Sequence, residues 1–404
     1  MSEKSIAALP VTDLVQTTRE KLYGLDFLRA LAIIMVLFFH TLVLFPHPDW
    51  LAYVAKFGWI GVDLFFALSG FLIASQLFAK ISEDKKISFM DFFIKRFFRI
   101  VPAYLVVVML YLSFPLLREH GTPAPYWKFL TFTQNLGLDL RSQGAFSHAW
   151  SLCVEEQFYL FFPVILIVLV YFNAVKKGFI ILLTLFLLGF VARLYAWNVL
   201  VFPFNGTNLF GVYWQEWIYY PTYARLDGLL VGILIAGIFQ FRPKLKAWLI
   251  QYGNWMLLVG LLVLSSAYVI CLDERSFSLC MYGFPLVDIG CGFLVLGAIS
   301  PSSFIYKYNS PFFSTIAMLS YSIYLIHKIT IHVSQEQLFK LSIPKESNLM
   351  MLLSLFLTVL AAFMLHYIIE KPFMKFRVKL LKPVSLKQPP AYIVEDSESD
   401  RDKV

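Results

Sequence analysis

The sequence predicts an all-α protein, a polytopic transmembrane helix bundle of about ten spans. Of its 404 residues, 59% are hydrophobic and only 15% are charged, whereas soluble globular domains contain about 45–50% apolar and about 25% charged residues. Aromatic residues reach 18% and phenylalanine occurs 41 times, which suits lipid-facing surfaces and interfacial belts. The apolar residues also form runs of the roughly 20 residues that a spanning helix needs. These three observations exclude a soluble globular domain.

Ten apolar runs are predicted to span the membrane. They cover residues 25–45, 57–79, 100–117, 151–172, 178–196, 217–240, 247–270, 282–300, 312–331 and 347–369. The segment 127–138 is too short to span, so we expect it at the membrane interface or as a re-entrant segment. The first 21 residues are polar and mixed in charge, so we expect no secretory signal peptide there.

The distribution of lysine and arginine predicts that both termini lie in the cytoplasm. The net charge of +8 comes from basic residues in short loops rather than in one patch, which argues against nucleic-acid binding. With the N-terminus inside, most of these residues fall in cytoplasmic segments, as the positive-inside rule requires. The cytoplasmic set includes Lys85, Lys86, Lys95, Arg96, Arg99, Lys176, Lys177, Arg242, Lys244 and Lys246.

The chain is expected to have three regions. Residues 1–22 form a cytoplasmic N-terminal segment, residues 23–372 the transmembrane domain, and residues 373–404 a cytoplasmic tail. The basic part of the tail suits anionic lipid, and its acidic end is typical of disorder. Because few residues follow the last predicted span, we expect no separate soluble catalytic domain and assign the chemistry to the membrane domain.

Arg29 and His40 are predicted to share one face of the first span. They are eleven residues apart, which is three helical turns plus about 20° and about 16 Å along the axis. Arg29 then lies near the cytoplasmic end, where snorkelling would also explain it, and His40 lies deeper. Ionisable residues inside spans are costly and usually functional, although a hydrogen-bonded structural histidine is the alternative interpretation of His40.

Six more ionisable residues fall in the predicted outer halves of the spans: Asp63, Glu155, Glu156, Arg225, Asp227 and His327. Together they predict a polar chamber that opens outward. Some of them would instead be ion pairs that fix helix packing, and Arg225 with Asp63 or Asp227 is the leading candidate.

Arg96 and Arg99 mark the cytoplasmic end of the third span. They are three residues apart, hence about 60° apart around the helix, and guanidinium groups suit phosphate oxygens. The alternative is simple positive-inside anchoring. A phosphate-binding pair on the inner side and a polar chamber on the outer side would suit a protein that binds a donor substrate from the cytoplasm and an acceptor substrate from outside.

These residues stand in seven stretches that resemble the acyltransferase-3 family of bacterial membrane O-acyltransferases. In chain order the stretches are Arg29-x10-His40, GVDLFFALSGFLI (61–73), Arg96-x-x-Arg99, HAWSLCVEEQFYLFFP (148–163), YARLDGLLVG (223–232), SYSIYLIHK (320–328) and IEKPF (369–373). The departures are mild, with Cys153 where the family often has serine and Ile326 where an aromatic residue is common.

The resemblance implies an enzyme that transfers acyl groups other than aminoacyl groups. Acyl-CoA, by default acetyl-CoA, would be the cytoplasmic donor substrate, with no permanently bound cofactor and no metal. The acceptor would be a hydroxyl of an envelope glycan or lipid-linked glycan, such as lipopolysaccharide O-antigen or exopolysaccharide. The chain resembles the stand-alone form of the family, and a multi-pass location in the bacterial inner membrane is implied.

The residues can be given roles in acyl transfer from a thioester. His40 would be the general base or a transiently acylated relay, because imidazole exchanges protons near neutral pH. Glu155 or Glu156 would orient its ring, with Asp63 as a second candidate. Arg225 or Tyr324 would stabilise developing negative charge. On the donor side, Arg96 and Arg99 would hold the CoA phosphates and Arg29 would guide the donor, while Asp227 and His327 are further binding candidates.

Three other functions are compatible with parts of the sequence. A proton-coupled transporter also uses buried ionisable residues, but no matched pair of Gly/Pro-broken helices indicates inverted repeats. An acyltransferase acting on a lipid or a secondary metabolite would differ only in its acceptor. A non-catalytic sensor is disfavoured because the candidate reactive positions are all occupied. Whether Cys271 and Cys280, near one predicted outer loop, form a disulfide is left open.

Overall fold

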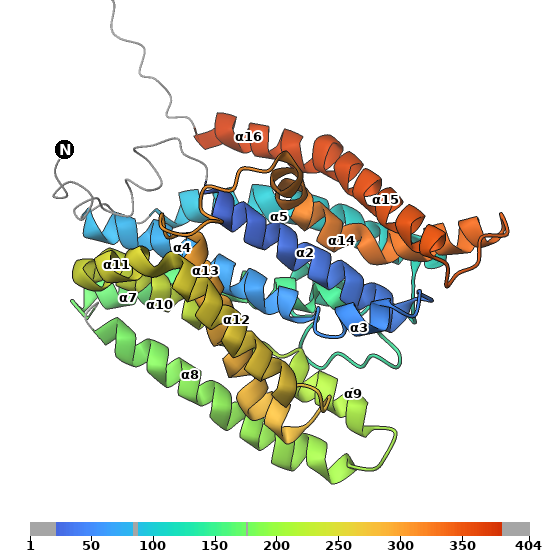
Figure 1. Cartoon of the computed structure of the whole chain (residues 1–404), viewed down its shortest axis with the longest axis horizontal. Coiled ribbons are helices and arrows are strands. Elements are labelled where there is room, and N and C mark those ends of the chain that lie inside the picture. The colour runs from blue at the N-terminus through green and yellow to red at the C-terminus, as the bar shows by residue number, and fades with distance from the viewer. Residues whose placement is uncertain (1–21, 84–87, 175–176, 382–404) are drawn as a thin grey trace, which may run out of the picture.

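The structure, a computed structural model, describes residues 22–83, 88–174 and 177–381, and this part of the chain is helical without a β-strand (Figure 1). The predicted all-α class is therefore confirmed. Residues 1–21 and 382–404, together with Lys85, Lys86 and Lys176, lie outside the described residues. The predictions for the N-terminal segment and the acidic end of the tail fall on those residues.

Each predicted span corresponds to a long helix. These helices are α2 (Tyr23–Leu44), α4 (Ile60–Ser82), α5 (Phe89–Ser113), α7 (Trp150–Tyr171), α8 (Gly178–Tyr195), α10 (Asp227–Phe241), α12 (Gly253–Ile270), α13 (Phe284–Ala298), α14 (Pro311–Phe339) and α15 (Asn348–Leu365). The shorter helices are α3 (Leu51–Ala55), α6 (Tyr126–Leu130), α9 (Phe210–Trp214), α11 (Pro243–Leu249) and α16 (Lys371–Leu381).

Eight helical stretches among the described residues are long and apolar enough to cross a membrane, so the chain is a polytopic membrane protein. The other two predicted spans correspond to α5, of 25 residues, and to α10, of only 15 residues. Helices are the expected solution, because backbone N–H and C=O groups in lipid must be satisfied within the segment.

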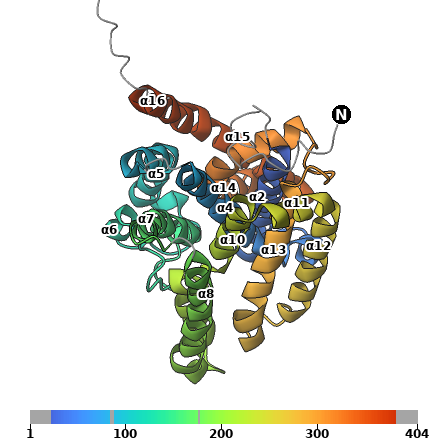
Figure 2. The ribbon, with the colours of Figure 1, turned by 90° about the vertical axis from the view of Figure 1, so that its left-hand side faces the viewer.

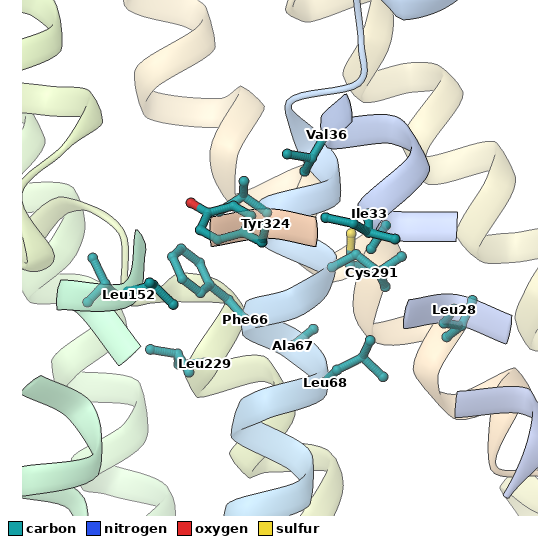
Figure 3. Packing of buried hydrophobic residues seen from close by; sticks show 14 of the residues in the cluster. Leu28, Ile33, Val36, Phe66, Ala67, Leu68, Leu152, Leu229, Cys291 and Tyr324 are labelled. Atoms are coloured by element: carbon teal, nitrogen blue, oxygen red, sulfur yellow. The ribbon is translucent and has the colours of Figure 1, made fainter. Parts of the chain in front are cut away.

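The long helices run side by side, with α2 and α4 in the middle, α15 and α16 along one edge and α8 along the other (Figure 1). The view turned by 90° places α5, α6 and α7 on one side of this centre and α11 and α12 on the other (Figure 2). Helix α4 packs against α10, and α2 packs against α4 and α14. Buried apolar side chains from nearly all the long helices form one core between them, part of which is shown in Figure 3. The labelled members are Leu28, Ile33, Val36, Phe66, Ala67, Leu68, Leu152, Leu229, Cys291 and Tyr324.

The predicted span 217–240 is wrong in its first half. Residues Gln215–Tyr219 form a π-helical turn, and the regular helix α10 begins only at Asp227. Pro221 explains the break, because proline has no N–H to donate to the preceding turn and is itself extended, with ψ at 138°. The break places Arg225 in an irregular segment between two helices.

The segment 127–138 does not span, as predicted. It contains only α6, and the loop around it folds inward, where Phe129 and Leu138 are buried. Buried amide side chains hold this loop in place. Gln134 Nε2 donates to the hydroxyl of Tyr104 at 3.1 Å, and Asn135 Nδ2 donates to Thr222 Oγ1 at 2.9 Å.

Glycines bring α4 and α10 into close contact. A Cβ atom at Gly70 would meet the backbone carbonyl of Leu229, and one at Gly232 would meet the backbone carbonyl of Ala67. Small residues at such crossings let two membrane helices approach closely. The contact positions α10, which carries Asp227 at its start, directly against α4, which carries Asp63.

Gly70→Ala and Gly232→Ala are each expected to destabilise the protein by about 1–3 kcal/mol, because the added methyl group overpacks a backbone contact. The measurement is the midpoint of thermal unfolding in detergent. Gly237→Ala is the matched control on α10, because its Cβ would meet only Phe78 Cε2 at 3.7 Å, and its midpoint should be unchanged or higher. Unfolding of Gly70→Ala at the wild-type midpoint would contradict this account of the crossing.

Candidate active site

Two cavities lie along the central helices. The first, of about 180 Å³, is the arginine cavity, whose polar lining includes Arg29, Arg96, Arg99, Glu155 and Tyr159. The second, of about 330 Å³, is the histidine cavity, lined by His40, His148 and Lys328 and by many aromatic side chains. Each cavity combines ionisable groups with a largely apolar surface, which is typical of small-molecule sites.

Helix α2 connects the two cavities. Arg29 lines the arginine cavity and His40 lines the histidine cavity, and their separation of eleven positions corresponds to about 16 Å along the helix. Arg96 and Arg99 come from α5, so three guanidinium groups converge on one cavity. Arg29 also lies 3.6 Å from Asp26, and Arg96 lies over the ring of Tyr159 at 5.3 Å.

Tyr324 of α14 lies between the two cavities and lines both of them. Val62 of α4 also lines both cavities. The tyrosine hydroxyl donates its proton to the backbone carbonyl of His148, because a carbonyl oxygen can only accept. Ser151 Oγ, 2.6 Å away, therefore donates to the Tyr324 oxygen. Ser151 lines the arginine cavity. The hydrogen bond between Ser151 and Tyr324 therefore lies between the arginine cavity and the histidine cavity.

His40 is held by a second histidine. His40 Nδ1 lies 2.9 Å from His327 Nε2, and His327 Nδ1 lies 2.8 Å from the carbonyl oxygen of Tyr324 and 3.2 Å from that of Ile323. The carbonyls can only accept, so His327 Nδ1 carries a proton, and in the neutral ring Nε2 is an acceptor. His40 Nδ1 must then donate, which leaves His40 Nε2 with a free lone pair beside the cavity.

His148 contributes a further lone pair. Its Nε2 lies 3.0 Å from the carbonyl oxygen of Tyr324 and therefore donates, so Nδ1 is unprotonated in the neutral ring. This Nδ1 is buried and has no hydrogen-bond partner among the described residues. The ring centroid of His148 lies 4.8 Å from that of His327 and 5.9 Å from that of His40. Three imidazoles thus lie together, and two of them, His40 and His148, line the histidine cavity.

The expected orienting carboxylates lie elsewhere. Glu155 accepts hydrogen bonds from Ser69 Oγ at 3.2 Å and from the Tyr159 hydroxyl at 2.7 Å, in the arginine cavity. Glu156 is on the same helix, and its Oε1 is buried without a hydrogen-bond partner among the described residues. Glu155 therefore does not orient His40, whose Nδ1 is hydrogen-bonded to His327 instead, whereas the role of Glu156 stays a prediction.

Asp63, Arg225 and Asp227 belong to a buried ionic network. Arg225 Nη2 lies 2.5 Å from Asp63 Oδ1, and Arg193 Nη1 lies 2.5 Å from Asp227 Oδ2. The predicted structural pair of Arg225 with Asp63 is thus confirmed, and the prediction that Asp63 orients His40 is wrong. Asp288 is buried beside this network, and its Oδ1 lacks a hydrogen-bond partner among the described residues.

Aromatic rings screen this network from the histidine cavity. The guanidinium of Arg225 lies 4.1 Å from the ring centroid of Phe284, 4.8 Å from that of Tyr219 and 5.3 Å from that of Trp150. All three rings line the cavity, whereas Arg225 does not. Arg225 therefore does not reach the site where it was expected to stabilise negative charge.

The predicted polar chamber is thus divided. His40 and Tyr324 line the histidine cavity, with His327 directly behind His40, whereas Glu155 faces the arginines and the aspartates are in the ionic network. The sequence interpretation missed His148, Lys328 and Arg193. Two of them stand in stretches already singled out, HAWSLCVEEQFYL and SYSIYLIHK, where a polar residue inside an apolar run was the available signal.

Cys271 and Cys280 are buried free thiols, so the disulfide that the sequence left open is not formed. Within residues 22–83, 88–174 and 177–381, no group of three His, Cys, Asp or Glu side chains could hold a metal ion.

Comparison with known proteins is consistent with this arrangement. A Staphylococcus aureus (strain COL) protein named "Putative O-acetyltransferase" is 29% identical over 385 residues, covering 89% of this chain and 58% of the relative. O-acetyltransferase OatA of Staphylococcus aureus (strain NCTC 8325 / PS 47) is 28% identical over 333 residues, covering 76% of this chain and 51% of the relative. The chain therefore spans about half the length of the curated relatives it matches. No solved structure matches it.

The family match covers the part of the chain that contains both cavities. Residues 22–367 match the family model described as an acyltransferase domain. This range contains every residue that lines the two cavities. The chain therefore belongs to the acyltransferase-3 family.

Proposed function

We propose that this protein is a membrane O-acyltransferase that moves an acyl group, by default acetyl, from acyl-CoA to a hydroxyl of an envelope glycan. The proposal rests on one observation of the structure. A cavity with three arginines and a cavity with an oriented histidine base lie at opposite ends of one face of α2 and meet at Tyr324. The family membership and the names of the relatives support acyl transfer as the chemistry.

The donor binds in the arginine cavity. Acyl-CoA carries several phosphate charges, and guanidinium groups bind phosphate oxygens through charge-assisted hydrogen bonds. Arg29, Arg96 and Arg99 provide such groups, and the cation–π contact of Arg96 with Tyr159 fixes the plane of one of them. With both termini in the cytoplasm, as the basic residues predict, this cavity opens toward the cytoplasm.

The acceptor binds in the histidine cavity. Aromatic side chains including Trp59, Trp150, Trp214, Tyr219 and Tyr268 line it, and their large apolar faces suit the C–H faces of sugar rings. The acceptor is then a glycan or lipid-linked glycan such as O-antigen or exopolysaccharide, and the protein lies in the inner membrane. No resident cofactor is required, because acyl-CoA is consumed as a substrate.

His40 acts as the general base. Its Nε2 takes the proton of the acceptor hydroxyl as the hydroxyl oxygen attacks the thioester carbonyl. Collapse of the tetrahedral intermediate breaks the C–S bond, and the departing CoA thiolate receives the proton from His40. His327 keeps Nδ1 of His40 protonated, so that Nε2 remains available. A transiently acylated His40 is the alternative route, and it uses the same lone pair.

The activity can be tested in cells of the source organism. The gene is deleted and complemented with wild type or with His40→Ala at matched membrane levels, and envelope glycan is analysed by mass spectrometry before and after mild base. Loss of a base-labile mass of acyl size, restored only by wild type, is expected and would identify both the acyl group and the glycan. An unchanged glycan profile would contradict a glycan acceptor.

Arg96→Gln and Arg99→Gln are each expected to raise the KM for acetyl-CoA about 10- to 100-fold. This range follows because a hydrogen bond to a charged group contributes about 1.5–3 kcal/mol. The KM for acetyl-pantetheine, which lacks the nucleotide phosphates, should change little. Lys95→Gln is the control, since this exposed residue of α5 lines neither cavity. Equal changes for both donors would contradict phosphate binding.

A further inference from the structure

Lys328 is a buried cation in the lining of the histidine cavity. Lys328 is 3% exposed, and it follows His327 directly on α14. The ammonium Nζ lies 3.2 Å from Ser147 Oγ and 3.4 Å from Glu119 Oε1. A lysine ammonium has three N–H donors; one is hydrogen-bonded to Ser147, and the longer ion-pair contact with Glu119 engages at most one more. One donor is therefore left for the cavity that the side chain lines.

The ammonium lies beside the histidines. Two pairs of adjacent residues face each other, Ser147 and His148 on one element and His327 and Lys328 on α14. Lys328 contacts Ser147, and the ring centroids of His148 and His327 are 4.8 Å apart. His40 is hydrogen-bonded to His327. The cation and the base therefore border the same space.

This cation differs from the other buried ones. Arg193, Arg225 and Lys328 are the buried arginine and lysine side chains among the described residues, and Lys328 alone of the three lines the histidine cavity. A buried ion pair is weak evidence for stability, because desolvation offsets the attraction between the charges. Ionisable groups retained inside a membrane protein usually mark a functional position.

Tyr324 places Lys328 next to the point where the cavities meet. The two residues are four apart on α14, so they lie on the same face about 6 Å apart along the axis. Tyr324 divides the arginine cavity from the histidine cavity. Lys328 and His40 both line the histidine cavity, which an acyl carbonyl coming from the arginine side would enter at Tyr324.

We infer that Lys328 is a catalytic residue that donates a hydrogen bond to the acyl carbonyl oxygen as it becomes an oxyanion; this rests on the proposed function. When the acceptor oxygen bonds to the acyl carbon, its proton goes to His40 Nε2 and the carbonyl π electrons move to oxygen. A preorganised donor in a water-poor site stabilises that charge. When the C–S bond breaks, the oxyanion reverts to carbonyl. Lys328 keeps its proton throughout and remains paired with Glu119.

The test compares kcat and KM in the purified full chain reconstituted in liposomes. Lys328→Met is expected to lower the kcat for acyl transfer about 10²- to 10³-fold, the usual effect of losing one oxyanion donor, with the KM for either substrate little changed. The slower hydrolysis of acetyl-CoA by water should fall by the same factor, because it forms the same oxyanion. Lys328→Arg should recover part of the rate.

A different result would assign Lys328 to acceptor binding. If Lys328→Met raises the KM for the acceptor and leaves kcat and hydrolysis unchanged, the lysine binds an anionic group of the acceptor and the inference is wrong. Lys328→Met/Glu119→Gln, which removes both charges of the pair, controls for an unpaired buried carboxylate. Wild-type kcat in this double variant would also overturn the inference.

A parallel assay of His40→Gln separates this inference from the proposed function. An inactive wild type would reject the proposed function itself. An active wild type, an inactive His40→Gln variant and a fully active Lys328→Met variant would reject only the role of Lys328.

Discussion

Replacement of His40 by glutamine is expected to lower the rate of acyl transfer about 10²- to 10⁴-fold, the range over which a positioned general base contributes. Glutamine retains polarity and can still hydrogen-bond to His327, but its amide cannot accept the acceptor proton. The free lone pair of His40 Nε2 follows from the chain of hydrogen bonds that runs from the Tyr324 carbonyl through His327 to His40. The measurement is the initial rate of ester formation with labelled acetyl-CoA at matched protein levels.

His332→Gln is the matched control for this experiment. His332 is also on α14 but lines neither cavity, so the same substitution should leave the rate within about twofold of wild type. A His40→Gln variant with the wild-type rate would show that His40 is a structural residue. The base would then have to be another group, and His148 Nδ1 is the nearest candidate.

Asp63→Asn is expected to destabilise the protein by about 3–5 kcal/mol, the usual cost of leaving one member of a buried ion pair uncompensated. Asp63 is 0% exposed and Arg225 is 2% exposed. The two are joined at 2.5 Å between α4 and the segment before α10. The measurement is thermal unfolding in detergent, with retention in the membrane fraction as a second readout.

The double variant Asp63→Leu/Arg225→Met provides the control for the ion pair. Removing both charges avoids the unpaired guanidinium, and such replacements are often close to neutral. We therefore expect the double variant to unfold at a higher temperature than Asp63→Asn. If the double variant is no more stable than the single one, the loss at Asp63 does not come from an unpaired charge.

The fold was predictable because lipid restricts the chain to helices. Ten long apolar runs therefore predicted ten helices, and each of them is present. The beginning of α10 was not predicted, since the run 217–240 is apolar enough to span and Pro221 alone signals the break. The inward fold of the loop around α6 was also not predicted. It depends on contacts of Gln134 and Asn135 with residues far away in the sequence.

The candidate site was predictable where one helix sets the geometry. The spacing of Arg29 and His40 on α2 and that of Arg96 and Arg99 on α5 follow from helix periodicity, and these residues line the two cavities. The contacts between side chains of different helices could not be predicted from helix periodicity. Nothing in the sequence indicates that His40 meets His327 rather than Glu155, because that choice depends on how α2, α7 and α14 are rotated against one another.

The central claim is that a donor in the arginine cavity and an acceptor in the histidine cavity react across the protein. It is tested most directly in liposomes that contain the purified protein in one orientation. Acetyl-CoA is supplied on one side and glycan from the deletion strain on the other, both being unable to cross the membrane. Base-labile ester on the glycan is predicted only when the two substrates are on opposite sides, with the acetyl-CoA on the side of Arg96 and Arg99. Equal ester formation with both substrates on one side would contradict the account.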